Sequence, residues 1–132
     1  MYLGAPANAH FDPRIRIGEG TAEIRIEVRP EFMIATGSVH GALYFKALDD
    51  AAFFACNSLV TDRFLPTASF NIHLLRPVSD GELVATGTAV HRSRSLWLGE
   101  AQLVDGEGRP VARGSGSFMR GRTELSAKVG YV

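Results

Sequence analysis

Residues 38–57, SVHGALYFKALDDAAFFACN, form the one long segment of this chain that predicts a helix. Its apolar side chains cover nearly the whole circumference of a 3.6-residue helical wheel, so other elements must surround this helix. Gly37 interrupts the preceding chain, and Ser38 can accept a hydrogen bond from a free N–H of the first turn. The sequence therefore predicts a single buried helix whose start is better defined than its end.

Two neighbouring carboxylates, Asp49 and Asp50, lie in the middle of this apolar segment. A buried, unpaired carboxylate costs roughly several kcal/mol, so at least one of them needs a specific reason. Lys46 is four residues before Asp50 and three before Asp49, and either pair can form on a helix. We favour the Lys46–Asp50 pair, which leaves Asp49 about 100° round the helix on an apolar stripe. There Asp49 is either an acid–base group with a raised pKa or an aspartate satisfied by another partner.

Alternating apolar and polar residues predict strands on both sides of the helix. Before it, residues 14–29 predict one long strand bent at two glycines, or a hairpin. After it, four further strands are predicted at 67–75, 82–91, 95–104 and 110–119. In the last strand Gly114 and Gly116 share a face, where we expect the helix to approach. The sum predicts an α+β fold in which a curled antiparallel sheet wraps around one central helix.

The size of the chain predicts a single domain over residues 1–132, with an N-terminal arm at 1–13 and a polar tail at 120–132. The arm reads as irregular or as a short helix, and the tail as loose or ordered only in an oligomer. The edge strands of the predicted sheet need partners, so we expect a dimer at least. With 14 basic and 14 acidic residues, the chain has no net field that favours nucleic acid or an anionic membrane.

Composition also excludes several kinds of site. The single cysteine, Cys56, cannot form an intrachain disulfide and reads as a buried apolar residue, which suits a cytoplasmic location. The longest apolar run, 51–56, is far shorter than the roughly 20 residues that cross a bilayer. The histidines lack metal-ligand spacing and no glycine-rich phosphate loop opens a helix, so we expect neither a metal nor a bound cofactor.

Two further positions are candidates for chemistry. His40 and Gly41 lie at the predicted helix start, where backbone N–H groups are free and would stabilise a developing oxyanion. The alternative for His40 is a capping or packing histidine. In the strand after the helix, hydrogen-bonding side chains alternate with apolar ones, and they line either a cleft, another subunit or plain solvent: Thr67, Ser69, Asn71 and His73.

Together these residues resemble the hotdog-fold acyl-CoA thioesterases of the phenylacetic-acid-degradation (PaaI-like) type. The resemblance rests on Val39-His40-Gly41-Ala42, on an acidic residue nine positions after His40, and on a strand over 67–75 that ends at Arg76-Pro77. It covers roughly Gly18 to Met119. That family implies a homodimer at least, and a homotetramer built from two dimers packed back to back.

The resemblance implies hydrolysis of a small or medium acyl-CoA, with coenzyme A present only as part of the substrate. Asp49 would be the general base or the nucleophile. The Gly41 N–H of a neighbouring subunit, beside His40, would hold the thioester oxygen, and Thr67 would hold Asp49 or the water. For the coenzyme A phosphates we favour Arg92 and Arg94.

These two arginines bracket Ser93 at a predicted turn, although arginines at turns are often simply solvated. Ser93 and Asn71 complete the predicted substrate-binding set. The chain departs from the family pattern at Ala42, in place of a second glycine, and at Ile34, where many members carry Asn or Gln. Ile34 supports an alternative, a non-catalytic protein that binds or senses acyl-CoA. A hotdog dehydratase needs a different arrangement of His and acid and ranks last.

Overall fold

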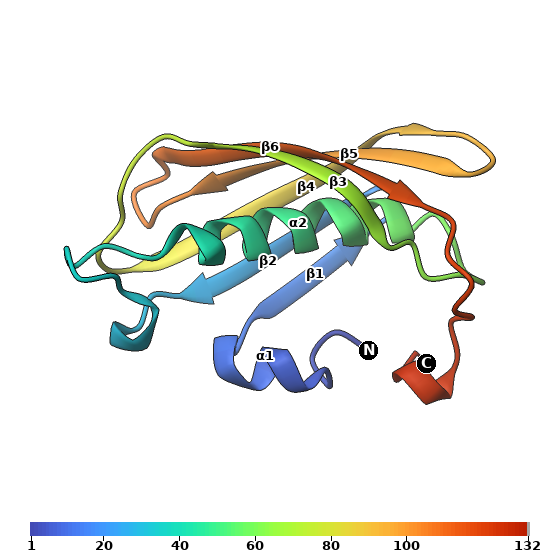
Figure 1. The fold of residues 1–132 in the computed structure, drawn as a ribbon, viewed down its shortest axis with the longest axis horizontal. Helices are drawn as coiled ribbons and strands as arrows, with labels where there is room; N and C mark the ends of the chain where they lie inside the picture. Colours follow the sequence, from blue (N-terminus) through green and yellow to red (C-terminus); the bar gives the residue numbers. More distant parts are fainter. Residues whose placement is uncertain (132) are drawn as a thin grey trace.

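Helix α2 (Gly41–Asn57) lies against one face of a curled, six-stranded antiparallel sheet (Figure 1). The computed structural model describes residues 1–131. The strands run in the order β1-β2-β4-β5-β6-β3, with these bounds: β1 Arg14–Gly18, β2 Thr21–Glu27, β3 Thr67–Leu74, β4 Glu82–Arg92, β5 Leu96–Val104 and β6 Pro110–Met119. The predicted α+β hotdog architecture is confirmed, and β1 and β3 are its two open edges.

Residues 14–27 form a hairpin, which settles the alternative that the sequence left open. Gly20 takes a positive φ of 75° in the turn between β1 and β2. The described residues also contain three short helical segments: α1 Pro6–Phe11, η1 Pro30–Phe32 and η2 Ala127–Val129. Within residues 1–131, no helix is long and apolar enough to cross a membrane.

The helix approaches the sheet most closely over glycines of the two central strands. A Cβ at Gly87 of β4 would overlap the carbonyl group of Ala51. A Cβ at Gly99 of β5 would lie 3.0 Å from the Ala52 carbonyl oxygen. Because the missing side chains let the helix backbone approach the strands, Ala51 and Ala52 are fully buried.

The expectation that the helix fills the space over the β6 glycines is wrong. That space is taken by the ring of Phe70 from the neighbouring strand β3, which lies against both Gly114 and Gly116. The sequence showed that these glycines make room for something large. It could not show which element supplies it, because β3 pairs with β6 only in the folded sheet.

The helix begins later than its sequence suggests. Its N-cap is His40, whose Nδ1 accepts a hydrogen bond from the Ala42 N–H at 2.9 Å, so the predicted cap at Ser38 is wrong. Ser38 belongs to a tight loop instead, where its carbonyl accepts from the Ile34 N–H at 2.8 Å. The capping alternative that the sequence left open for His40 is therefore the one observed.

Residues 120–131 are bonded back onto the same chain, so the expectation of a loose tail is wrong for them. Gly121 N–H donates to the Phe64 carbonyl, and Phe64 N–H donates to the Thr123 carbonyl at 2.9 Å. Arg63 pairs with Glu124 at 3.1 Å. These backbone bonds tie the tail to the loop that follows α2, and Figure 1 shows the two chain ends close together.

Candidate active site

One face of α2 runs along the edge strand β3. Residues spaced by four lie on the same face of a helix, and three of them face β3 here. Phe45 and Asp49 each contact a residue of that strand, and a Cβ at Gly41 would lie 3.1 Å from Leu74 Cδ1. We call these six residues the α2–β3 seam: Gly41 with Leu74, Phe45 with Phe70, and Asp49 with Thr67. The seam therefore has a free helix N-terminus at one end and a carboxylate at the other.

The carboxylate end of the seam depends on a β-bulge. The register between β3 and β6 shifts between Thr67 and Ser69, so that Thr67 faces Phe118 and Phe70 faces Gly116. The extra residue turns Thr67 to the helix side of the sheet, away from the polar row in which simple alternation placed it. Its hydroxyl donates to Asp49 Oδ1 at 2.9 Å.

Asp49 is the half-buried carboxylate of the site. Burial raises its pKa, the Asp50 charge adds to that rise, and the Thr67 hydrogen bond and the Lys46 charge oppose it. A raised pKa brings a carboxylate closer to the range in which a general base both accepts and releases a proton. The geometry agrees with the role that the family resemblance implied for Asp49 and Thr67, a role that stays a prediction.

Asp50 forms an ion pair with Lys46, as the spacing of these two residues along the helix predicted. Lys46 Nζ lies 2.9 Å from Asp50 Oδ2, which confirms the favoured i,i+4 pair. A second donor was missed by the sequence analysis: the Tyr2 hydroxyl donates to the same oxygen at 2.6 Å. No sequence signal links an N-terminal tyrosine to the middle of α2, because only the folded arm brings them together.

The other end of the seam holds the predicted oxyanion donor. The Gly41 N–H has no acceptor among residues 1–131, whereas the next N–H, that of Ala42, is capped by His40. His40 orders the helix start rather than reaching toward Asp49. Since an α-helix rises about 1.5 Å per residue, Gly41 and Asp49 lie about 12 Å apart along α2. They cannot act on one thioester within a single protomer.

The predicted substrate-binding residues lie apart from Asp49. Arg92 ends β4, and Ser93 closes the β4–β5 hairpin by accepting from the Leu96 N–H at 3.2 Å. The register places Arg92, Trp97, Phe118 and Thr67 in one cross-strand row, so Arg92 is about 14 Å from Thr67. Their role, with that of Arg94, stays a prediction.

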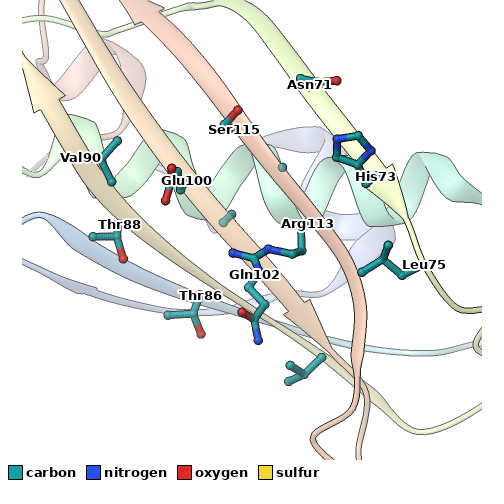
Figure 2. A pocket seen from close by; sticks show the side chains of 13 residues that line it. Asn71, His73, Leu75, Thr86, Thr88, Val90, Glu100, Gln102, Arg113 and Ser115 are labelled. Carbon is teal, nitrogen blue, oxygen red and sulfur yellow. The ribbon is translucent and has the colours of Figure 1, made fainter.

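Asn71 lies on the opposite face of the sheet from α2. It lines a shallow hollow of about 790 Å³ together with side chains of β4, β5 and β6, as Figure 2 shows. The structure therefore does not bring Asn71 to Asp49. Its neighbours in the predicted polar row, Ser69 and His73, are also exposed on that face of the sheet.

Two other residues bear on the chemistry. Cys56 is fully buried, as predicted, and burial raises the pKa of its thiol to about 11, so it is not a nucleophile at neutral pH. Ile34 is 42% exposed in the loop before His40 and offers no hydrogen bond from its side chain to a substrate. Within residues 1–131 no three side chains are grouped so that they could hold a metal ion.

Comparison with known proteins identifies the family. A family model described as the thioesterase superfamily matches residues 36–112, more than half of the chain and the part that contains α2, β3 and most of the sheet. This chain belongs to the thioesterase superfamily. A Mycobacterium tuberculosis relative named as an esterase is 32% identical over 104 residues, covering 74% of this chain and 73% of its own. A Saccharolobus solfataricus relative, also named as an esterase, is 25% identical over 86% of this chain and 81% of its own.

Solved structures show the same fold. The PaaI protein from the phenylacetic acid degradation operon of Escherichia coli superposes with a TM-score of 0.87 at 23% identity, covering 96% of this thioesterase-superfamily chain and 91% of that one. The M. tuberculosis protein superposes with a TM-score of 0.84 at 24% identity over 90% and 98% of the two chains. These matches confirm the hotdog resemblance inferred from the residues, and the family supports hydrolysis of a thioester as the activity.

Proposed function

We propose that this protein is an acyl-CoA thioesterase in which Asp49 activates the attacking water or attacks the thioester itself. The observation that carries the proposal is the α2–β3 seam. Within residues 1–131, one end holds a half-buried carboxylate that Thr67 bonds and that forms no ion pair, and the other end holds an N–H without an acceptor. In a chain of the thioesterase superfamily, these are the two functions that acyl transfer needs, a base or nucleophile and an oxyanion donor.

Two protomers would complete the site. In the part of the chain that the structure describes, no strand pairs with the outer edge of β3. The seam exposes large apolar side chains there, with Phe45 at 41% and Leu74 at 57% exposure. If two β3 edges pair antiparallel about a two-fold axis, the seams run in opposite directions. The Gly41 end of one protomer then lies beside the Asp49 end of its partner, which resolves the separation of about 12 Å within one chain.

The reaction follows from these groups. With Asp49 as base, its carboxylate takes a proton from water as the water oxygen attacks the thioester carbon. The Gly41 N–H of the partner subunit stabilises the oxyanion, whose collapse expels the coenzyme A thiolate; the proton held by Asp49 can then pass to that sulfur. With Asp49 as nucleophile, an anhydride forms first and water then hydrolyses it. A general base supplies typically about 10²- to 10⁴-fold and an oxyanion donor about 10²- to 10³-fold in rate.

Coenzyme A would reach the site along the sheet. Arg92 and Arg94 at the β4–β5 tip form none of the ion pairs found within residues 1–131, so both are available for phosphate oxygens. Arg92 lies in the same cross-strand row as Thr67, about 14 Å away by strand spacing. The long pantetheine arm would connect these positions.

The outer face of the sheet would join two such dimers into a tetramer. Cross-strand register places Thr88, Glu100, Ser115 and Asn71 in one row, and Thr86, Gln102, Arg113 and His73 in the next (Figure 2). Among residues 1–131, neither Arg113 nor Glu100 has an ion-pair partner, although residues of β1, β2 and the start of β4 form several ion pairs. A self-facing contact can pair each arginine with the other copy's glutamate.

Thiol release from a panel of aliphatic, aromatic and hydroxylated acyl-CoAs tests the function, with the wild type and Asp49→Asn measured side by side. We expect turnover of at least one ester and a loss of 10²-fold or more in the variant, by the typical magnitude for a base. Asp62→Asn, a surface carboxylate paired with Arg120, is the matched control and should retain activity. Full activity of Asp49→Asn would refute the assignment.

Ile34 favours a second candidate, a protein that binds acyl-CoA without hydrolysing it. An isoleucine at this position lacks the amide with which many relatives would contact the thioester or water. Tight binding of acyl-CoAs by calorimetry, with no thiol release from any ester, would support this alternative. Ile34→Asn separates the two candidates further: a gain of turnover in the variant identifies Ile34 as the reason for weak catalysis.

A further inference from the structure

The N-terminal arm crosses α2 at the level of the two carboxylates. Tyr2 is 9% exposed, and its hydroxyl donates to Asp50 Oδ2 at 2.6 Å. Lys46 Nζ lies 2.9 Å from the same oxygen. Two donors, one from a remote segment and one from the helix, thus converge on one carboxylate oxygen next to the proposed acid–base residue.

The arm is built so that Tyr2 stays in this place. The Tyr2 carbonyl accepts from the buried Asn8 side-chain amide at 2.8 Å and from the Ala5 N–H at 3.1 Å. The Tyr2 ring packs edge-on against Phe54 with centroids 5.0 Å apart. Met1 is held through its amino group, which donates to the Gly130 carbonyl at 2.7 Å. Because both its backbone and its ring are held, the Tyr2 side chain does not sample many rotamers.

Lys46 is enclosed by the same arm. Its ammonium lies 5.4 Å from the Tyr2 ring centroid and 4.9 Å from that of Phe11, and the Lys46 and Asp50 side chains are each only 18% exposed. Aromatic faces attract a cation and exclude water from it. The arm therefore fixes both donors to Asp50 and shields the pair from solvent, which strengthens their electrostatic interaction.

We propose that Tyr2 is a positioning residue. Together with Lys46, it fixes the orientation of the Asp50 carboxylate and offsets its negative charge, so that Asp49 serves as the single acid–base group of the site. Without the hydroxyl, the Asp50 charge would be compensated by one donor only. Because the two carboxylates are adjacent in the sequence, an uncompensated Asp50 charge acts on Asp49. This role rests on the proposed use of Asp49.

Within the described part of the chain, few groups act on Asp49. Asp50 and Lys46 supply opposite charges from α2, and β3 supplies the uncharged Thr67 hydroxyl. The arm adds the Tyr2 hydroxyl, through Asp50. Burial raises the pKa of Asp49 and the Asp50 charge raises it further, whereas Thr67 and Lys46 lower it. Removal of a donor from Asp50 should therefore push the Asp49 pKa upward.

The direct test is a carbon-13 NMR titration of the aspartate carboxyls, with Asp49 assigned from the spectrum of Asp49→Asn. Tyr2→Phe keeps the ring, its contact with Phe54 and the Lys46 contact, and removes only the hydroxyl. We expect the Asp49 titration midpoint to move to higher pH in Tyr2→Phe. An unchanged or lowered midpoint would overturn the proposal, and this result does not require that the protein hydrolyse any thioester.

A double-mutant cycle shows whether the effect passes through Asp50. Asp50→Asn should lower the Asp49 midpoint by removing the neighbouring charge, and Tyr2→Phe should have no further effect in that background. An equal upward shift with and without Asp50 would overturn the proposed route. Tyr44→Phe is the matched control, since its hydroxyl donates to the Arg76 carbonyl at 3.0 Å and its loss should leave the Asp49 midpoint unchanged.

Kinetics then link the shift to turnover if the thioesterase proposal holds. In Tyr2→Phe we expect kcat/KM to fall about twofold to threefold on the acidic side of the profile, with the plateau at higher pH retained. A uniform loss at every pH, without a moved midpoint, would indicate a purely structural role and contradict the proposal. Absence of thiol release in the wild type would count against the thioesterase alone and would leave the titration as the decisive result.

Discussion

At the scale of single residues, two neighbouring carboxylates differ in their partners. Asp49 accepts from a neutral hydroxyl, and Asp50 accepts from an ammonium and a second hydroxyl. Among residues 1–131, Asp49 accepts a side-chain hydrogen bond only from the Thr67 hydroxyl, whereas Asp50 accepts from both Lys46 and Tyr2. Side chains that differ by one position in the sequence therefore differ strongly in chemistry. The helix spacing predicted which aspartate pairs with Lys46, and burial of the other follows from its place on the apolar stripe.

Thr67→Val should move the acidic limb of the curve of kcat/KM against pH. The hydroxyl stabilises the ionised form of Asp49 and lowers its pKa, so its loss raises that pKa and shifts the limb to higher pH. Thr67→Ser keeps the hydroxyl and should keep the limb in place. The pH dependence of kcat/KM for the three proteins checks this, and a shared limb for all of them contradicts it.

Asp49→Asn should make the fold more stable than the wild type at pH 7. Because burial raises the folded-state pKa of Asp49, the folded chain holds that proton more tightly than the unfolded chain does. Ionisation therefore costs stability as the pH rises from the ordinary aspartate pKa through the folded one. Urea unfolding at pH 7 and at pH 3.5 measures the gain, which should disappear at the lower pH.

At the scale of elements, local irregularities position the site. The β-bulge in β3 turns Thr67 toward α2, and the glycines of β4 and β5 let α2 approach the sheet. Neither feature follows from binary patterning, since alternation alone assigned Thr67 to the opposite face. The pattern did predict the strands themselves, within one or two residues at most ends.

Gly87→Ala should destabilise the fold by about 3 kcal/mol. The new methyl group would overlap the Ala51 carbonyl of α2, a backbone atom that cannot move alone. Gly106→Ala is the control, because its nearest neighbour would be 3.9 Å away, and it should change stability by less than about 0.5 kcal/mol. Urea midpoints compare the two variants; equal midpoints would contradict the close helix–sheet contact.

At the scale of the whole molecule, the β3 edge left open within residues 1–131 and the distance between Gly41 and Asp49 support the proposed site between two chains. The exposed apolar residues of the seam lie along that edge. The N–H donor and the carboxylate cannot meet without a second copy. The family supports oligomerisation in general, and the arrangement given above is the one that the seam favours.

Mixed dimers test this division of the site. Gly41→Pro removes the N–H at the first helical position, where proline is well tolerated, and Gly41→Ala is the control that adds a side chain but keeps the N–H. We expect Gly41→Pro and Asp49→Asn to be nearly inactive alone. Mixed after unfolding and refolding together, they should regain activity, because each hybrid contains one intact Asp49–Gly41 pair. Mass spectrometry shows whether the mixture contains hybrid dimers. If hybrids are present and activity is not regained, the site lies within one chain.

Charge reversal on the outer face tests the tetramer. Arg113→Glu and Glu100→Arg should each weaken the association of dimers by repulsion, and the combined variant should restore it. Light scattering at several concentrations gives the masses. A tetramer that neither single change affects would contradict the proposal that two dimers meet through the outer face of the sheet. A wild type that stays a dimer would also contradict it.

The sequence by itself determined the central helix, the strands, the family and which of the two aspartates pairs with Lys46. These depend on periodicity and on short spacings along a single helix, which local chemistry controls. Only the tertiary structure decided that His40 caps the helix, that Phe70 occupies the space over Gly114 and Gly116, and that Tyr2 reaches Asp50. The Phe70 and Tyr2 contacts join segments far apart in the chain, and such contacts exist only after the sheet has closed around α2. The His40 cap is a local bond with Ala42, and only the folded loop before α2 shows that His40 rather than Ser38 takes this place.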